Sequence, residues 1–235
     1  LSPEMSANLI QIEEGVSFVE AATTEPLATS LHAANLGDAQ DAETHVIMGA
    51  GIIGLGILQC IKARSSAKVI VVDLSEKRLA KAKELGADTT VNAGEVDAVQ
   101  EILAITGSEH LGLVEAINGN VDVVYDSAGM GKNFKGTSVL EQALSMASIN
   151  GRVVIVAVYE QEVSVDYNIV VRKGLKILGS WAWTMDEFVE ASELIRTGQI
   201  DRKPLVSHTF SLEQASEAYE TQLLAEEAVK VVFTP

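Results

Sequence analysis

The sequence predicts an α/β fold in which helices cover both faces of a doubly wound, six-stranded parallel sheet. Three observations support this prediction. Short β-branched runs alternate with segments of helical period between residues 45 and 180, which is the pattern of a parallel α/β sheet. Several of these runs are apolar at nearly every position, as strands covered on both faces are. The first run leads into a glycine-rich turn that opens a helical segment.

Six strands are expected in this central part of the chain. They span residues 45–48, 68–72, 89–91, 121–125, 152–158 and 175–178. Helices are predicted between them, over residues 53–64, 76–85, 96–105 and 138–149. Ser75 is suited to cap the second helix because its hydroxyl can accept a hydrogen bond from the first turn, and Gly86 can end that helix.

Less regular segments flank this part of the chain. Before it, residues 8–12 are expected to be extended, and a helix is predicted over residues 24–36 with Pro26 in its first turn. After it, we predict a helix over 186–197, a strand over 205–210, a helix from the capping box Ser211-Leu212-Glu213-Gln214 through Thr221, and a final strand over 229–233. Neither flank forms an obvious domain by itself.

The composition is that of a globular protein with a large core. Of the 235 residues, 47% are hydrophobic and 21% are charged, and the formal net charge is −16. A chain this acidic is expected to bind neither nucleic acid nor anionic membrane surfaces. No apolar run approaches the ~18 residues that a membrane span needs. Cys60 is the only cysteine, which excludes a disulfide framework within the chain and favours a reducing compartment, the cytoplasm.

The motif Gly49-Ala50-Gly51-Ile52-Ile53-Gly54 follows the first predicted strand and opens a helix. Gly49 permits the tight turn, Gly51 leaves room for a pyrophosphate near the backbone, and Gly54 lets the helix pack closely on the strand. The free N–H groups of the first helical turn, which begins at Ile52 and Ile53, can then bind the phosphates. This context predicts a dinucleotide site.

Asp73 ends the second predicted strand, 19 residues beyond Gly54. A carboxylate there can accept hydrogen bonds from the hydroxyls of the adenosine ribose and would repel a 2′-phosphate, so the sequence favours NAD over NADP. Arg78 could accommodate that phosphate, although we expect it to pack against the ribose or the edge of the adenine. The alternative for Asp73 is a simple turn residue between strand and helix.

Two other classes of enzyme with a glycine-rich first turn fit less well. Methyltransferases usually carry an acidic residue just before the glycines, where this chain has Met48. Short-chain dehydrogenases need a Tyr-x-x-x-Lys pair, and none of the four tyrosines is followed by lysine at the fourth position. That chemistry is therefore excluded.

Further strings accompany the glycine motif in a fixed order: Thr24-Glu25-Pro26-Leu27-Ala28, Leu85-Gly86-Ala87-Asp88, Val121-Asp122-Val123-Val124, Gly151-Arg152-Val153-Val154, Gly198-Gln199-Ile200 and Lys230-Val231-Val232. Together they resemble the medium-chain, zinc-type alcohol dehydrogenases, especially the branch of sorbitol, threonine and butanediol dehydrogenases. The resemblance covers residues 23–235. It implies a Rossmann NAD-binding domain over 25–180, with 1–24 and 181–235 as remnants of a second, GroES-like catalytic domain.

The resemblance also implies roles for individual residues. Glu25 corresponds to a glutamate beside the catalytic zinc, although it is equally well explained as a carboxylate in the first turn of a helix. Thr29 is expected to line the nicotinamide, with a simple exposed helix residue as the alternative. Ser127, Ala128, Val156 and Ala157 lie at the carboxyl ends of predicted strands, where cofactors bind in open sheets, and Gly179 and Ser180 are weaker candidates of the same kind. We identify no catalytic residue in the chain itself.

Several features depart from the family pattern. The sequence has no match to the N-terminal domain that supplies zinc ligands and a proton relay in the family, and because it begins with Leu1 rather than Met we expect it to start inside a longer protein. Zinc is therefore expected only where that domain is present. Residues 107–120 are longer than the usual link and are expected to be a surface insertion. Ala157 stands where the family usually has glycine, and Cys60 and the four histidines show no metal-ligand spacing.

These observations lead to one hypothesis and one alternative. The chain is predicted to be the cofactor-binding part of an NAD-dependent alcohol or polyol dehydrogenase that acts on a small-molecule alcohol. A homodimer or homotetramer is expected, with residues 176–180 at the interface. The alternative is a short, non-catalytic protein that binds NAD as a sensor or structural module.

Overall fold

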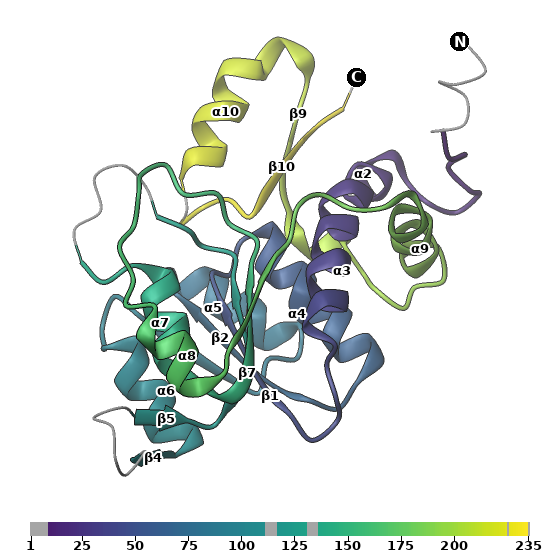
Figure 1. The fold of residues 1–235 in the computed structure, drawn as a ribbon. Helices are drawn as coiled ribbons and strands as arrows, with labels where there is room; N and C mark the ends of the chain where they lie inside the picture. The colour runs from purple at the N-terminus through teal and green to yellow at the C-terminus, as the bar shows by residue number, and fades with distance from the viewer. Residues whose placement is uncertain (1–8, 111–116, 131–135, 225, 235) are drawn as a thin grey trace.

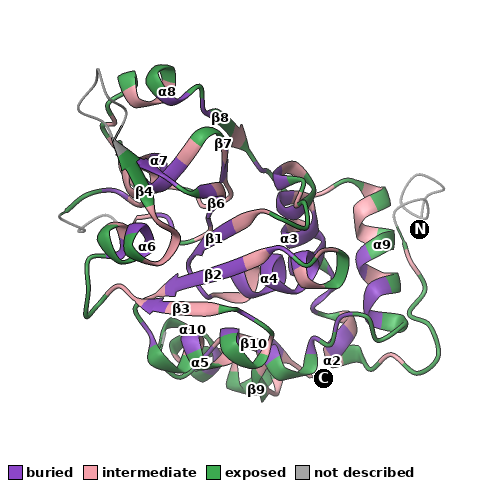
Figure 2. Ribbon diagram, turned by 90° about the horizontal axis from the view of Figure 1, so that it is seen from below, coloured by how far each residue is buried: buried purple, intermediate pink, exposed green. Residues whose placement is uncertain are grey.

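Six parallel strands form the centre of the computed structural model, which describes residues 9–110, 117–130, 136–224 and 226–234 (Figure 1). The strands are β1 (Thr44–Met48), β2 (Lys68–Asp73), β3 (Thr89–Asn92), β6 (Val121–Asp126), β7 (Ala147–Ile155) and β8 (Lys176–Gly179). Their order is β3-β2-β1-β6-β7-β8, and every neighbouring pair is parallel (Figure 2). The predicted doubly wound sheet is therefore confirmed.

The chain builds this sheet outward in two directions from β1. It first adds β2 and β3 on one side and then crosses over to add β6, β7 and β8 on the other. The connections that follow the neighbouring strands β1 and β6 therefore run in opposite directions along the sheet. In doubly wound sheets this reversal point is where ligands bind.

Helices cover both faces of the sheet. On one face lie α3 (Thr24–Gly37), α4 (Ile52–Arg64) and α5 (Glu76–Glu84), and on the other lie α6 (Ala98–Thr106), α7 (Val139–Met146) and α8 (Asn168–Lys173). Leu31, Ile47 and Leu58 belong to the first core, and Ile70 and Ile102 belong to the second. Because alternate residues of each strand enter different cores, the strands are apolar on both sides.

The C-terminal segment adds a small unit beside this sheet (Figure 1). It consists of α9 (Met185–Arg196), η1 (Lys203–Leu205), β9 (Val206–Phe210), η2 (Leu212–Gln214), α10 (Ala215–Leu223) and β10 (Lys230–Phe233). β9 and β10 pair in parallel in a sheet of their own. Helix α9, in contrast, packs against α3, and Ala191 lies in the same core as Leu31. The division of the chain into 1–24, 25–180 and 181–235 stays a prediction.

Three predicted boundaries were wrong: the end of the helix predicted over 138–149 and both ends of the strand predicted over 152–158. The helix predicted over 138–149 ends at Met146, because Ala147 pairs with Val121 as the first residue of β7. β7 itself ends at Ile155 rather than at residue 158, since the N–H groups of the next two residues turn back to the carbonyl of Asp126. The sequence also did not predict α8 or the short helix α2 (Phe18–Ala21), which are too short to show a helical period.

The segment expected to be a surface insertion is partly built into the fold. Strands β4 (Ser108–His110) and β5 (Ile117–Gly119) form an antiparallel pair, and residues 111–116 lie outside the described residues. Asn118 is buried, and its side-chain carbonyl accepts a hydrogen bond of 2.8 Å from the N–H of Ile149. This bond ties the hairpin to the start of β7.

Lys173 ends α8 and is fully buried. Its ammonium group donates to the carbonyls of Leu144, Ser145 and Ala147, at 3.2, 2.7 and 2.9 Å. These are carbonyls at the C-terminal end of α7, which need donors and attract positive charge. The lysine thus helps to end α7 where the sequence predicted its continuation.

Burial lowers the pKa of Lys173 to about 8, against ~10.4 in the unfolded chain. Between these values the unfolded chain holds a proton that the folded chain has lost, so this group makes stability rise with pH. We expect the free energy of unfolding of the wild type to gain about 1.5 kcal/mol relative to Lys173→Met between pH 8 and pH 9.5. Urea denaturation at both pH values measures this difference. Lys77→Met, at an exposed lysine on α5, is the control, and a parallel response of Lys173→Met and the wild type would contradict the prediction.

Candidate functional site

The glycine motif forms the turn between β1 and α4. Gly49 has a φ of +101°, a conformation that side chains disfavour, and its N–H donates to the carbonyl of Val72 at 2.7 Å. A Cβ atom on Gly54 would lie 1.8 Å from the carbonyl oxygen of Gly49, so only glycine permits this approach of helix to turn. The predicted roles of both residues agree with this geometry.

The N-terminus of α4 is open for an anion. Gly51 is the N-cap residue and supplies no side-chain cap, so the first N–H groups of the helix, from Ile52 and Ile53 onward, lack a capping partner. A Cβ atom on Gly51 would meet no atom of the described structure within 4 Å. Space and free donors therefore coincide at the positive end of the helix, as a phosphate group requires.

Asp73 ends β2 directly beside this turn. One carboxylate oxygen accepts a hydrogen bond of 2.6 Å from the N–H of Ala50, and the other accepts one of 2.9 Å from the N–H of Ser75. The side chain is half-buried. Each carboxylate oxygen has further lone pairs, so the group can still accept hydrogen bonds from a ligand. The two halves of the predicted dinucleotide motif are therefore in direct contact.

Arg78 has a protein partner where the sequence analysis expected a sugar or base edge. Its Nη2 atom donates to the carbonyl of Ala228 at 2.8 Å. Nearby, the hydroxyl of Ser75 donates to the exposed side chain of Glu226 at 3.0 Å. The segment before β10 thus lies beside the site that was assigned to the adenosine.

Four of the predicted cofactor residues, Ser127, Ala128, Val156 and Ala157, lie directly after the carboxyl ends of β6 and β7. The hydroxyl of Ser127 donates to the carbonyls of Met48 and Gly49, at 2.8 and 3.1 Å, and so holds the glycine turn. Ala128 packs against Gly49. Val156 and Ala157 follow β7, half-buried.

Two further candidates lie at the carboxyl end of β8. The N–H of Ser180 donates to the carbonyl of Ile155 at 2.8 Å, so Ser180 lies next to the end of β7. Its hydroxyl is buried and has no hydrogen-bond partner within the described part of the chain. The neighbouring Gly179 has no atom within 4 Å of where its Cβ would lie.

Sequence reasoning missed Asp126 and Tyr159. Asp126 is fully buried at the end of β6, where one carboxylate oxygen accepts from the N–H of Gly129 at 3.0 Å and the other from the hydroxyl of Tyr159. Burial raises the pKa of Asp126 and also that of Tyr159. A charged residue that ends an apolar strand was the signal available in the sequence.

Glu25 lies in the first turn of α3 and is exposed. One of its carboxylate oxygens accepts hydrogen bonds from Trp183 Nε1 at 3.1 Å and from the hydroxyl of Thr29 at 3.3 Å. Thr29 thus touches Glu25, and Trp183 also packs on Phe188 with ring centroids 4.6 Å apart. No group of three or more His, Cys, Asp or Glu side chains among the described residues could hold a metal ion.

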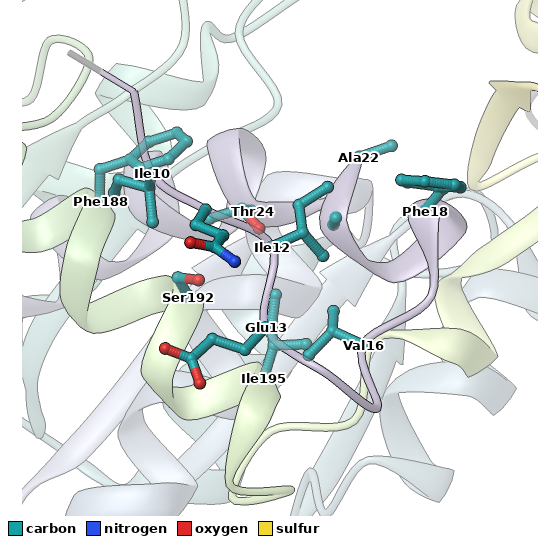
Figure 3. Close-up of a pocket in the computed structure, with 12 residues that line it drawn as sticks. Ile10, Ile12, Glu13, Val16, Phe18, Ala22, Thr24, Phe188, Ser192 and Ile195 are labelled. Carbon is teal, nitrogen blue, oxygen red and sulfur yellow. The ribbon is translucent and has the colours of Figure 1, made fainter. Parts of the chain in front are cut away.

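A cavity of about 350 Å³ lies away from the glycine turn (Figure 3). Figure 3 shows that its walls include the segment carrying Ile10, Ile12 and Glu13 and the helix α9. The lining is mostly apolar and includes none of the residues predicted to bind a cofactor. None of the described helices is long and apolar enough to cross a bilayer.

Comparison with known proteins shows which family this chain resembles. The model of the zinc-binding dehydrogenase family matches residues 53–197. Sorbitol dehydrogenase of Arabidopsis thaliana is 31% identical over 225 residues, which cover 95% of this chain and 58% of that protein. The chain thus spans about three fifths of the length of this relative.

Two solved structures have the same fold. A putative zinc-binding dehydrogenase from Sinorhizobium meliloti, bound to NADP, matches with a TM-score of 0.81 and 29% identity over 96% of this chain and 62% of its own. An alcohol dehydrogenase from Escherichia coli CFT073, complexed with NADH, matches with a TM-score of 0.80 and 26% identity over 94% of this chain and 61% of its own. The glycine turn, the sheet order and these matches agree, and the chain belongs to the zinc-binding dehydrogenase family.

Proposed function

We propose that this chain is the cofactor-binding part of an NAD-dependent alcohol or polyol dehydrogenase. Such an enzyme transfers a hydride between a secondary alcohol and NAD. The observation that carries the proposal is the contact between the Asp73 carboxylate and the N–H of Ala50 in the glycine turn, 2.6 Å long. This contact brings a ribose-binding carboxylate next to a phosphate-binding helix end, which is the arrangement that a dinucleotide needs.

The free space and donors of the site fit a nicotinamide dinucleotide. The pyrophosphate would bind at the N-terminus of α4, above Gly51, and the adenosine ribose would bind at Asp73. The other half would then extend across the carboxyl ends of β6, β7 and β8, near Ser180, whose buried hydroxyl has no hydrogen-bond partner among the described residues. Bound NAD supplies the hydride acceptor, and the chain supplies orientation.

Two observations favour NAD over NADP. The Asp73 carboxylate would repel a 2′-phosphate. Arg78, the nearest candidate to bind such a phosphate, already donates to the carbonyl of Ala228. The Sinorhizobium relative is bound to NADP, and the titration described below compares both nucleotides in this chain.

A zinc ion would polarise the substrate hydroxyl and lower its pKa. Glu25 is the residue of this chain that we propose as a zinc ligand, because it is exposed and corresponds to the family glutamate. The described residues provide no complete ligand set, so the remaining ligands and the alcohol site would come from another part of a longer protein. We propose the cytoplasm as its location.

Titration of the chain with NADH and with NADPH, followed by nucleotide fluorescence, tests the proposal. We expect NADH to bind more tightly than NADPH. Failure of both nucleotides to bind would contradict it. The alternative, a non-catalytic NAD-binding module, is separated by turnover assays with zinc on the longest natural form of the protein. NADH binding without turnover of any polyol or secondary alcohol would favour that alternative.

We propose that the exposed edge of β8 pairs with a second copy of the chain, giving a homodimer or homotetramer. In the described sheet β8 pairs only with β7, and exposed apolar residues lie in β8 at Ile177, shortly after it at Trp181 and in the preceding helix α8 at Val171. We expect Ile177→Asp to reduce the mass measured by light scattering to that of a monomer. Val189→Asp, at an exposed position on α9, is the control, and a wild-type monomer would contradict the proposal.

A further inference from the structure

Asp126 joins three segments at the carboxyl edge of the sheet. Its backbone carbonyl accepts the N–H groups of Val156 and Ala157, at 2.9 and 3.0 Å. Its carboxylate accepts the N–H of Gly129, in the loop after β6, and the hydroxyl of Tyr159, in the segment after β7. Asp126, the last residue of β6, therefore holds both the loop that follows β6 and the segment that follows β7.

The hydroxyl of Tyr159 extends this network. It accepts the N–H of Leu140, in the first turn of α7, at 2.9 Å while it donates to Asp126. The side chain of Tyr159 therefore bridges the segment after β7, the end of β6 and the N-terminus of α7. Removing its hydroxyl would release both bonds and leave the ring in place.

Burying the carboxylate of Asp126 to make these hydrogen bonds costs free energy. The side chain is fully buried, and its described partners are the backbone N–H groups of Ala128 and Gly129 and a hydroxyl rather than a cation. Burying a carboxylate without a counter-charge costs free energy, which is why burial raises its pKa. A hydrogen bond to a charged acceptor is, in return, shorter and stronger than one between neutral groups. The buried carboxylate therefore forms a strong hydrogen bond with the hydroxyl of Tyr159.

The position of the pair links it to the cofactor. If Asp73 binds the adenosine ribose, the adenosine half of a dinucleotide lies at the carboxyl end of β2. The nicotinamide half of the dinucleotide must then extend to the carboxyl ends of β6 and β7, where the N–H groups of Val156 and Ala157 donate to the carbonyl of Asp126. We propose that Asp126 and Tyr159 are positioning residues, which hold residues 156–159 at the distance that the nicotinamide half requires without touching it. This inference rests on the proposed function.

Tyr159→Phe tests the inference when the binding of two ligands is compared. NADH spans both halves of the site, whereas ADP-ribose lacks the nicotinamide ring. We expect the variant to bind NADH about tenfold more weakly, because residues 156–159 are no longer held. Its affinity for ADP-ribose should stay within about twofold of the wild type, since the adenosine side keeps all its contacts. Isothermal titration measures both affinities.

Tyr167→Phe is the matched control, because Tyr167 is an exposed tyrosine in the neighbouring segment. It should bind both ligands as the wild type does. Equal weakening of NADH and ADP-ribose in Tyr159→Phe, or no change in either, would overturn the inference. Failure of the wild type to bind either ligand would instead refute the proposed function, so the two failures are distinguishable.

Asp126→Asn gives a second, independent arm. Asparagine keeps a carbonyl oxygen that can accept the tyrosine hydroxyl, so it should weaken NADH less than Asp126→Ala does. If Tyr159→Phe does not fold, as judged by circular dichroism, the comparison of NADH with ADP-ribose in Asp126→Asn decides the question. Identical NADH affinities of Asp126→Asn and Asp126→Ala would count against the hydrogen bond as the positioning element.

Discussion

Gly54→Ala is expected to abolish binding of the dinucleotide and to destabilise the chain by about 3 kcal/mol, at the upper end of the cost of overpacking. The new methyl carbon would lie 1.8 Å from the carbonyl oxygen of Gly49 and 2.8 Å from the hydroxyl of Ser127. The carbonyl is backbone and cannot rotate away, so the helix α4 would have to move off the turn. Urea denaturation and NADH titration measure the two effects.

Gly51→Ala is the matched control within the same motif. The backbone at Gly51, with φ of −77° and ψ of −173°, suits alanine, and the added methyl group would meet no atom within 4 Å. We expect unchanged stability but NADH binding weakened about tenfold or more, because the methyl group would occupy space needed by the pyrophosphate. Undiminished NADH binding in Gly51→Ala would show that no phosphate approaches this position.

Asp73→Asn is expected to weaken NADH binding by about 10- to 100-fold, the range for hydrogen bonds to a charged group. The amide has the same shape but loses the negative charge and one acceptor. NADPH should lose much less affinity, since the charge that repels its 2′-phosphate disappears. The preference for NADH over NADPH should therefore shrink, and paired titrations of the two nucleotides measure this ratio.

The ratio of the NADH affinity to the NADPH affinity separates an effect of Asp73→Asn on ribose binding from an effect on the stability of the fold. Asp73 also accepts the N–H groups of Ala50 and Ser75, so Asp73→Asn will lose some stability whatever its role in binding. A loss of stability alone would weaken both nucleotides alike. Asp97→Asn is the control, because Asp97 is a carboxylate that caps α6 by accepting the N–H of Gln100 at 3.0 Å. An unchanged NADH-to-NADPH ratio in Asp73→Asn would remove Asp73 from the ribose site.

The fold was predictable because its information is local. The apolar runs of β1, β2 and β6 and the helical periods between them can be recognised in short windows of sequence. The contact of Asp73 with the glycine turn was also predictable in kind, since adjacent parallel strands bring their carboxyl ends to the same edge. The boundary between α7 and β7 was not, because it depends on Val121 and Lys173, each more than 20 residues from Ala147.

The sequence by itself determined the sheet, the glycine turn and the acid beside it, because strand pattern, glycine spacing and strand ends are local properties. Only the tertiary structure brought Asp126 to Tyr159, 33 residues later. It alone also buried Arg202 completely and paired it with Gln59, across 143 residues. Such polar contacts depend on which helices and loops pack against one another. The partner of a side chain that is distant in sequence therefore cannot be identified from the local sequence alone.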